Sequence, residues 1–341
     1  MDGPLCSRFY IACRDGDLVT AENELSKLKP SEISRLEPNG STALHAAAYY
    51  GHTEIVRLFV RRCCSRSIRN KYGLTPYEEA KTDEIGELLK RHSGTKRYDK
   101  KTIPLEWISD NFDGIWKNLL HPGRLFECGD DSPEKIKARQ DCVVRWLEEH
   151  LTDKEELELI TSWFKLAFEN NSAEYLIRAY TEETDFFRKL NQDLANIDIN
   201  KELSDPEMCA PLIIARTLFR CAYYARDADN CVEIYLYRAV KYDEKEISKY
   251  KEHITKGPIK TKTFWSTSKS RKEAENMNKD YNTMLLLKSR DPDSRRTLDI
   301  AKLSSYVCEE EVLIVPLTYM QITSVKKKGN KHEIQIVYWD W

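Results

Sequence analysis

Three short stretches in the C-terminal half carry side chains that could do chemistry together. Arg238 comes first, the hydroxyl run Ser266–Ser268 comes second, and the carboxylate run Glu309–Glu311 comes third. An arginine can hold an anionic group through charge-assisted hydrogen bonds. On an extended strand, alternation would place the side chains of Glu309 and Glu311 on one face, about 6–7 Å apart along it. Two carboxylates in that arrangement could stabilise a developing positive charge and hold a cationic group beside it.

Each stretch alone has an ordinary structural explanation. An arginine is common at a strand end, Ser-Thr-Ser occurs in many loops, and a run of glutamates is usually a solvated acidic face. The order of all three along predicted strands is far more specific than any one of them. The elements that must position them are short β-branched or aromatic runs, which predict strands over Cys231–Tyr237, Thr283–Leu287, Glu311–Pro316 and Glu333–Trp339.

The chain before these strands has a helical pattern. Ala138–Leu151 and Glu155–Phe168 carry apolar residues at spacings of three and four, which predicts two helices. Helices followed by several short strands indicate an α+β domain. No residue between 102 and 165 suggests chemistry of its own.

The N-terminal part contains an internal repeat. Asn39–Ala47 resembles Tyr72–Ala80 at an offset of 33 residues (72 − 39 = 33). This period, with a Thr-Pro-Leu-His-like signature, is typical of ankyrin repeats. Residues 5–92 therefore predict an all-α solenoid of about three repeats, whose outer two are degenerate because end repeats must present polar surface. Within this pattern we expect Thr42 and His45 to hydrogen-bond around a helix start, which is a structural role and not a catalytic one.

Composition limits the classes of function. The chain has 341 residues, 41% of them hydrophobic and 32% charged, which is enough apolar material for folded domains. A formal net charge of −2 gives no electrostatic reason to expect nucleic-acid or membrane binding. We see no secretory signal pattern and no apolar run long enough to span a bilayer. The ten cysteines contain no Cys-x-x-Cys pair, so we expect no metal site, buried free thiols and a cytoplasmic location.

Together, the three chemical stretches resemble the Arg…Ser-Thr-Ser…Glu-x-Glu signature of arginine-specific mono-ADP-ribosyltransferases, both vertebrate-type enzymes and bacterial toxins. The flanking segments Ala179–Asn191 and Arg296–Ser304 are similar to the same family, so the likeness spans about 170–341. The resemblance implies an NAD(+)–protein-arginine ADP-ribosyltransferase, which transfers ADP-ribose from NAD to arginine side chains of target proteins and releases nicotinamide. It also implies a mixed, mainly antiparallel split β-core, with NAD as co-substrate and no metal.

The resemblance assigns roles to five side chains. Glu311 would stabilise the cationic ribose and grip a ribose hydroxyl, and Ser266 would hydrogen-bond Glu311 or the ribose. Glu309 would hold the acceptor guanidinium and accept its proton. Arg238 would pair with an NAD phosphate. Tyr306 would either contact the target protein or pack within its loop.

One position departs from the family pattern. The family usually has glycine after the arginine, where the backbone contacts the nicotinamide amide, and here Ala239 stands there. Alanine would weaken the site if that position needs a positive φ. We expect the other two hydroxyls of the run, Thr267 and Ser268, to bond to backbone at the strand end.

A polar, charged stretch at Ser93–Lys101 is the expected boundary between the two halves. Domain boundaries fall in such exposed segments, because few contacts cross them. We therefore expect a multidomain chain, and the repeats would bind a protein partner or the protein substrate. Its parts would be ankyrin repeats over 1–95, a helical linker region over 96–165 and an ADP-ribosyltransferase catalytic domain over 166–341.

Two alternatives stay open at this point. The enzyme could be an NAD glycohydrolase with water as acceptor, although water would not need Glu309 as a guanidinium clamp. The chain could also be a non-catalytic ankyrin scaffold with a degenerate transferase domain, although every signature residue is present. Poly-ADP-ribose synthesis is disfavoured, because enzymes of that kind carry histidine where Arg238 stands.

Overall fold

The structure is a computed structural model that divides into two compact units, each described below by itself. The first unit comprises Met1–Gly94, Ser162–Glu183 and Ala301–Cys308, and the second comprises Thr95–Thr161, Thr184–Ile300 and Glu309–Trp341. The expected linker Ser93–Lys101 lies outside the described residues. Those residues are 5–28, 30–62, 64–90, 107–108, 133–169, 174–182, 184–197, 209–224, 235–290, 296–304, 306–316 and 318–339.

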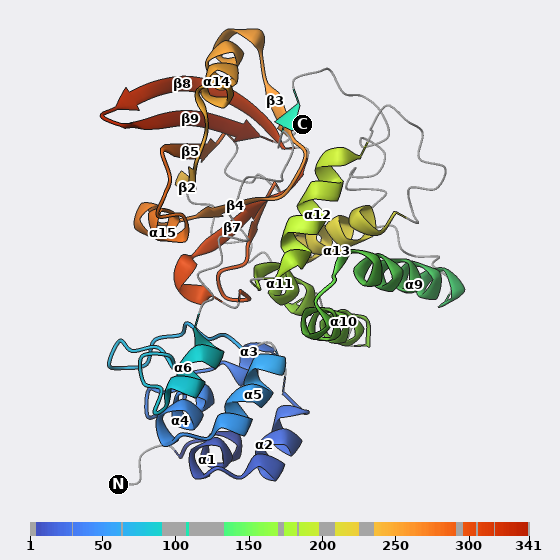
Figure 1. The fold of residues 1–341 in the computed structure, drawn as a ribbon, viewed down its shortest axis with the longest axis vertical. Coiled ribbons are helices and arrows are strands. Elements are labelled where there is room, and N and C mark those ends of the chain that lie inside the picture. The colour runs from blue at the N-terminus through green and yellow to red at the C-terminus, as the bar shows by residue number, and fades with distance from the viewer. Residues whose placement is uncertain are drawn as a thin grey trace. The chain divides into compact units, whose positions relative to one another are not determined.

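The N-terminal part of the first unit is a stack of short helices, as the repeat pattern predicts (Figure 1). Paired helices end at glycines in the left-handed conformation, Gly16 with φ 80° and Gly51 with φ 87°, where a Cβ would be strained. Their apolar faces form one buried core that includes Phe9, Leu44 and Phe59. The helices are α1 (Arg8–Asp15), α2 (Leu18–Leu25), α3 (Pro30–Ile33), α4 (Ala43–Tyr50), α5 (Thr53–Arg61) and α6 (Asp83–Leu89).

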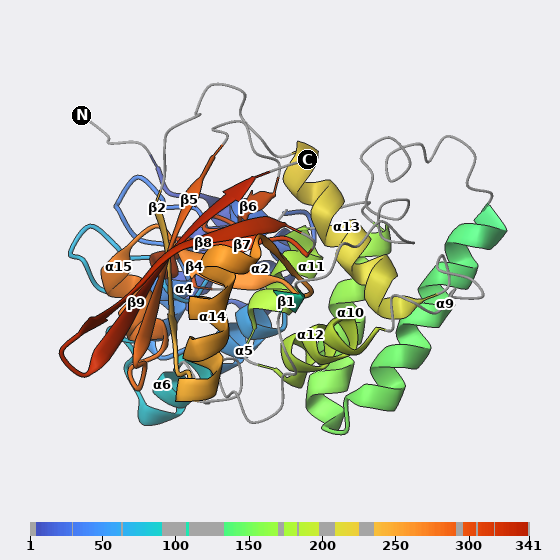
Figure 2. The same ribbon diagram turned by 90° about the horizontal axis from the view of Figure 1, so that it is seen from above.

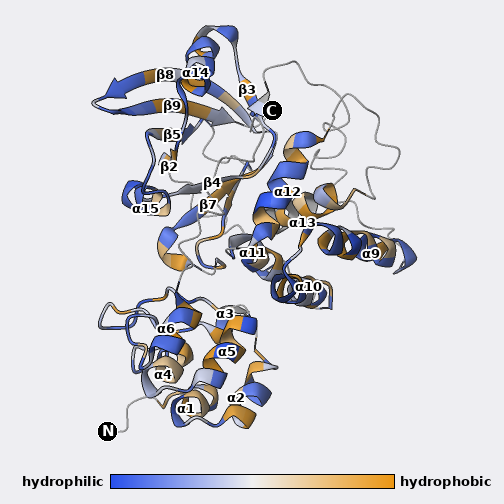
Figure 3. Ribbon diagram, viewed as in Figure 1, coloured by the Kyte–Doolittle hydropathy of each residue, from blue (hydrophilic) through white to orange (hydrophobic). Residues whose placement is uncertain are grey.

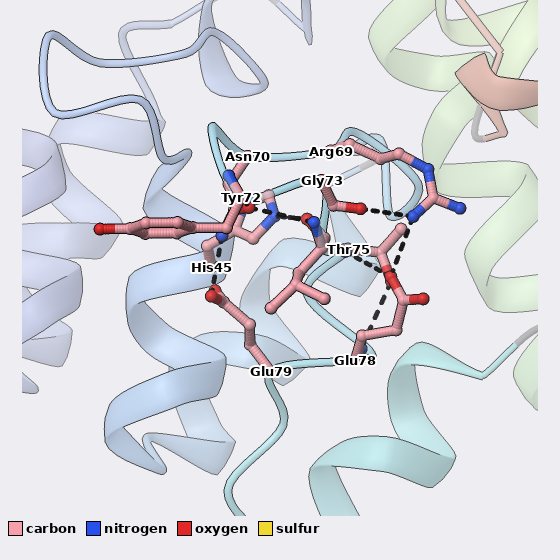
Figure 4. Close-up of polar contacts among 9 residues, drawn as sticks. His45, Arg69, Asn70, Tyr72, Gly73, Thr75, Glu78 and Glu79 are labelled. Atoms are coloured by element: carbon pink, nitrogen blue, oxygen red, sulfur yellow. Dashed lines mark hydrogen bonds and ion pairs between the residues drawn. The ribbon is translucent and has the colours of Figure 1, made fainter.

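His45 has the structural role expected of it. Its backbone N–H donates to the Thr42 hydroxyl at 3.3 Å, and its ring Nδ1 lies 2.8 Å from the same hydroxyl, so the pair caps α4. The ring Nε2 lies 3.0 Å from the carbonyl oxygen of Leu74 in the next repeat. Figure 4 shows this region, where Asn70 accepts from the backbone N–H groups of Tyr72 and Leu74 and so closes the turn. The contact of His45 with the Leu74 carbonyl therefore ties neighbouring repeats together.

The last repeat is degenerate in a specific way. Thr75–Ala80, which aligns with the start of α4, forms turns and not a helix. Glu78 still accepts from the Thr75 backbone N–H at 2.7 Å, as a helix-start residue would. The helix α6 begins eight residues after Thr75, whereas α5 begins eleven residues after Thr42, so less chain is left for a helix in between. This outcome agrees with the expected degeneracy of an end repeat.

Five further helices lie between residues 133 and 224 of the described part of the chain. Both helices predicted from apolar spacing are confirmed: Ala138–Leu151 corresponds to α9 and Glu155–Phe168 to α10. Polar and apolar residues alternate along both helices in Figure 3, as expected for amphipathic helices. In the second unit, the indole N–H of Trp146 on α9 donates to Asp193 at 2.8 Å and links α9 to α12. The five are α9 (Pro133–His150), α10 (Lys154–Glu169), α11 (Glu174–Thr181), α12 (Asp185–Asn196) and α13 (Ala210–Tyr224).

The described strands of the second unit form one nine-stranded sheet in the order β1-β3-β8-β9-β5-β2-β4-β7-β6. Every described pairing is antiparallel except that of β5 with β9, so the mixed, mainly antiparallel core is confirmed. The strands are β1 (Trp107–Ile108), β2 (Tyr235–Val240), β3 (Ile259–Thr261), β4 (Trp265–Ser268), β5 (Thr283–Ser289), β6 (Thr297–Asp299), β7 (Glu311–Ile314), β8 (Tyr319–Lys328) and β9 (Lys331–Trp339).

The sheet is split at its middle. Strands β2 and β4 share a single paired position, Tyr237 with Ser268, whereas β2 pairs with β5 along its whole length. Two helices pack on the sheet: α14 (Glu244–Lys256) lies against β8, and α15 (Arg271–Met277) lies against β2 and β4 (Figure 2). The split therefore falls where the predicted arginine and hydroxyl run meet.

All four predicted strands are present among the described residues, with shifted ends. The first prediction began at Cys231, but residues 231–234 lie outside the described residues and β2 begins at Tyr235. The strands β1, β3, β6 and β8 were not predicted from the sequence.

Candidate active site

Arg238 lies on β2, and its side chain reaches across the split to β4. The guanidinium Nη1 donates to the carbonyl oxygen of Ser266 at 2.9 Å. The guanidinium carbon lies 5.6 Å from the ring centre of Trp265, within range of a cation–π contact. Only 9% of Arg238 is exposed. Trp265 directly precedes the hydroxyl run, and its contact with the arginine was not predicted from the sequence.

Ser266 and Glu311 are brought together by the register of β4 with β7. Ser268 pairs with Glu311 and Ser266 pairs with Leu313, so Ser266 is the diagonal neighbour of Glu311 on the same face. The hydroxyl of Ser266 donates to Oε1 of Glu311, as predicted. Both residues are buried, Ser266 at 2% and Glu311 at 0% exposure. The carboxylate of Glu311 is thus fixed at the start of β7.

The other two hydroxyls of the run bond to backbone, also as predicted. Thr267 Oγ1 donates to the carbonyl oxygen of Val312 at 2.5 Å. Ser268 Oγ donates to the carbonyl oxygen of Glu309 at 2.6 Å and accepts from the backbone N–H of Ser270 at 3.0 Å. The three hydroxyls therefore bond to the Glu311 side chain, the Val312 carbonyl and the Glu309 carbonyl, and so fix the chain on both sides of Glu311.

The backbone of Glu309 differs from the sequence expectation. We expected Glu309 and Glu311 on one face of an extended strand, and this is wrong. Glu309 ends the 3-10 turn η3 (Val307–Glu309), and Glu310 is left-handed with φ 47°. The carbonyl oxygen of Glu310 accepts from the Lys269 backbone N–H at 3.2 Å, which holds the turn in place. The chain becomes extended only at Glu311, because β4 ends opposite it.

Ala239 fits its position without strain. Among the described residues, Glu310 is the one non-glycine residue with a positive φ, so Ala239 does not need the freedom of glycine. Its carbonyl oxygen accepts from the side-chain amide of Asn278 at 3.2 Å. Asn278 was not singled out from the sequence, and it carries no motif that could have identified it.

Tyr306 lies in the first compact unit, in the loop that precedes η3. It is 5% exposed, and the guanidinium carbon of Arg66 lies 5.7 Å from its ring centre. Its backbone N–H donates to the Ser304 hydroxyl at 3.0 Å. Tyr306 is thus packed within its own compact unit, and its role toward a target protein stays a prediction.

The second unit therefore brings together three of the predicted side chains on adjacent strands: Arg238 on β2, Ser266 on β4 and Glu311 on β7. Glu309 stands two residues before Glu311, the first residue of β7, and is 2% exposed. A buried cation, an oriented carboxylate and a second carboxylate nearby can hold an anionic ligand and stabilise positive charge on it. In the described part of the chain, no group of three or more His, Cys, Asp or Glu side chains is suited to a metal ion. Within the same residues, no helix has the length and apolarity to cross a membrane.

Curated proteins match only part of this chain. Mouse oxysterol-binding protein-related protein 1 is 32% identical over 110 residues, which is 31% of this chain and 11% of that protein. The human NAD-capped RNA hydrolase NUDT12 is 36% identical over 76 residues, which is 22% of this chain and 16% of that protein. The chain thus spans about a sixth or less of the length of these relatives.

Solved structures of ADP-ribosyltransferases are similar to this chain at low identity. HopU1 of Pseudomonas syringae pv. Tomato DC3000 is 14% identical, with a TM-score of 0.42 over 61% of this chain and 98% of that one. Exoenzyme S from Pseudomonas aeruginosa, in complex with human 14-3-3 protein beta and bound to Carba-NAD, is 13% identical, with a TM-score of 0.39 over 59% and 88%.

Family profiles match both halves of the chain. The profile described as ankyrin repeats (many copies) matches residues 25–80. The profile described as ADP-ribosyltransferase exoenzyme matches residues 151–338, which is more than half of the chain and includes β2, β4 and β7. ADP-ribosyltransferases take NAD as co-substrate. The chain therefore belongs to the ADP-ribosyltransferase exoenzyme family, with ankyrin repeats in front of its NAD-using domain.

Proposed function

We propose that this protein transfers ADP-ribose from NAD to arginine side chains of target proteins. The observation that carries the proposal is the oriented carboxylate of Glu311, held by Ser266 beside the buried Arg238, with a second carboxylate at Glu309. Three other findings support it: the family match, the order of β2, β4 and β7 in the sheet, and the hold of Ser268 on Glu309.

The chemistry begins with cleavage of the bond between ribose and nicotinamide. Its electron pair goes to the nicotinamide ring, which leaves as a neutral base, and positive charge develops on the ribose. A fixed carboxylate in a water-excluded site stabilises that charge, and Glu311 is suited to this because it is fully buried and oriented. Arg238 is suited to the phosphates of NAD, since its planar guanidinium can donate several bonds to one anion.

The acceptor step explains the second carboxylate. A guanidinium is always protonated, so it needs a group that both holds it and takes its proton as the new nitrogen–carbon bond forms. Glu309 is suited to this, and its backbone is held by a hydrogen bond to Ser268. The proposed products are the ribosylated arginine, nicotinamide and a proton on Glu309.

We further propose that the ankyrin repeats bind a protein partner or the substrate. Several large aromatic side chains are exposed on them, among them Tyr49 at 58% and Tyr72 at 70%. Exposed aromatic residues are enriched in protein interfaces. The six cysteines whose side chains the structure describes are free thiols, and we propose a reducing location such as the cytoplasm.

The test uses the full chain with NAD labelled in the adenylate part and agmatine as a small guanidine acceptor. We expect labelled ADP-ribosyl-agmatine from the wild type. Glu311→Gln should lose ~10²–10³-fold of both transfer and NAD hydrolysis, because one oriented electrostatic contact is worth that much. Release of free ADP-ribose alone would identify a glycohydrolase, and no nicotinamide release at all would identify a non-catalytic scaffold.

A further inference from the structure

The ankyrin repeats share a compact unit with two segments from the transferase-family region. These segments are Ser162–Glu183 and Ala301–Cys308. The second one is the loop that leads into η3 and Glu309, and it is called the acceptor loop below. The proposed function does not explain why this loop packs with the repeats.

The contacts come from one short piece of the repeats, just after α5. Arg66 forms an ion pair with Glu182, and both side chains are only 9% exposed. The same guanidinium lies over the ring of Tyr306 in the acceptor loop, at 5.7 Å from its centre. The Cys308 backbone N–H donates to the Ser67 hydroxyl at 3.5 Å.

A second contact joins the segment Ser162–Glu183 to the C-terminal end of α5. The indole N–H of Trp163 donates to the carbonyl oxygen of Arg61 at 3.1 Å, and Trp163 is fully buried. A buried charge that loses its partner is costly, and a partly desolvated cation over an aromatic face is favourable. Arg66 therefore connects Glu182 and the acceptor loop through one guanidinium.

The acceptor loop is held at its end by two hydroxyls. Ser67 contacts the backbone of Cys308, and Ser268 contacts the backbone of the next residue, Glu309. Between Glu309 and β7 stands Glu310 in its left-handed conformation, which persists only where surrounding contacts hold it. Loosening the loop on the repeat side would therefore act through the chain on Glu309, while Glu311 keeps its own bond to Ser266.

We propose that Arg66 is a positioning residue for the acceptor step, acting through Tyr306 and the acceptor loop on Glu309. In this proposal Tyr306 is the anchor of the loop and does not itself read the target. The proposal rests on the proposed function, because the acceptor step is a step of arginine transfer. It gives the repeats a positioning role in that step and no role in the cleavage of NAD.

The test compares Arg66→Ala with Arg69→Ala in the full chain. Arg69 stands in the same part of the repeats, but its side chain is 55% exposed and bonds only locally, to Gly73 and Glu78. Transfer to agmatine and NAD hydrolysis are measured from one labelled NAD pool. We expect Arg66→Ala to lower transfer roughly tenfold to a hundredfold with hydrolysis and the KM for NAD unchanged, since small misplacements cost that much. Arg69→Ala should change neither activity.

Conservative variants separate positioning from loss of structure. Arg66→Lys keeps the charge and should have more transfer activity than Arg66→Ala. Tyr306→Phe keeps the aromatic ring and should have the transfer activity of the wild type. Tyr306→Leu should reproduce the defect of Arg66→Ala, and the double variant should be no worse than either single one. A defect in Tyr306→Leu without one in Arg66→Ala would mean that the ring contacts the target, which overturns the proposal. Equal loss of transfer and hydrolysis in Arg66→Ala would overturn it as well.

A measurement without turnover keeps this proposal distinct from the arginine assignment. Hydrogen exchange of peptides covering 301–308 should speed up in Arg66→Ala and stay as in the wild type in Arg69→Ala, with exchange in β5 unchanged in both. If the wild type shows no transfer to agmatine but the exchange result holds, the arginine assignment fails while the coupling of Arg66 to the loop stands. Unchanged exchange in 301–308 would overturn the coupling itself.

Discussion

The hydroxyl of Ser268 donates a 2.6 Å hydrogen bond to the backbone carbonyl oxygen of Glu309, although 41 residues separate them in sequence. Ser268 is fully buried and lies opposite Glu311 in the ladder of β4 with β7. One hydroxyl therefore links the strand that orients Glu311 to the turn that carries Glu309.

Ser268→Ala should lower arginine transfer more than NAD hydrolysis. The change leaves a buried carbonyl oxygen without this donor, at a cost of about 1–3 kcal/mol, and frees the turn at Glu309. Thr261→Val is the matched control, because Thr261 Oγ1 also donates to a buried carbonyl oxygen, that of Val315, and accepts from a backbone N–H. Steady-state rates and Tm are measured for both variants. The same ratio of transfer to hydrolysis in both would contradict a role for Ser268 at Glu309.

Glu309→Gln should separate the two activities. Glutamine keeps the size of the side chain but cannot take a proton from a guanidinium at neutral pH, so transfer should fall by ~10²–10⁴-fold. Slow hydrolysis should survive, because Glu311 is held by Ser266 independently of Glu309. Glu310→Gln makes the same change at the exposed neighbour and should alter neither activity. A parallel loss of both activities in Glu309→Gln would assign Glu309 to the cleavage step.

Arg238→Lys should weaken NAD binding about tenfold and leave the KM for agmatine unchanged. Lysine keeps the charge but loses the planar group that donates to Ser266 and could still donate to phosphate. Calorimetric titration with NAD gives the affinity, and Arg271→Lys, which alters an arginine paired with Glu333 on the sheet, is the control. Equal NAD affinity in wild type and Arg238→Lys would leave Arg238 a structural link between β2 and β4.

The repeats should lose stability in mild acid because of His45. Burial lowers the pKa of His45 below its ordinary value, and the opposing effect of the contact with the Leu74 carbonyl is smaller. In the unfolded chain, His45 takes up a proton below about pH 6.5, whereas in the folded chain it stays neutral to a lower pH. The free energy of unfolding therefore decreases as the pH drops below about 6.5. The slope is at most about 1.4 kcal/mol per pH unit.

This prediction is checked by thermal unfolding between pH 8 and 5. His45→Gln should be less stable at pH 8, since it loses part of the cap, and should show a smaller decline toward pH 5. His52→Gln, on the surface of the same repeats, should decline like the wild type. If His45→Gln follows the wild-type decline, the acid sensitivity belongs to another group.

Much of the sheet could be predicted because its strands carry local signals. The apolar residues of β5, β7 and β9 cluster or alternate as buried strands do. The hydroxyl run Ser266–Ser268 also made the hydrogen bonds to Glu311 and to backbone predictable. In contrast, β8 ends in Lys326–Lys328, which have no apolar signal and become a strand by pairing with β9. Only the pairing with β9 identifies that end of the strand.

The turn at Glu309 could not be predicted for a related reason. Three glutamates in a row have no turn signal, and the left-handed Glu310 is held by the backbone of Lys269 and the hydroxyl of Ser268, both remote in sequence. Likewise, nothing in the repeat period indicates that Arg66 meets Tyr306. Local patterns report which face of an element is buried, and they do not report which distant segment covers it.

The first unit has consequences for how the chain is made. Its last segment, Ala301–Cys308, lies 241 residues beyond the repeats where Cys308 meets Ser67. At roughly 5–20 residues per second, a ribosome needs roughly 10–50 s to add that length. During this interval the repeats can fold, but the site around Arg66 must wait for its partner. A recombination event at the boundary after the repeats would separate Arg66 from Tyr306. Replacing this repeat array by another one would therefore remove the contact between them.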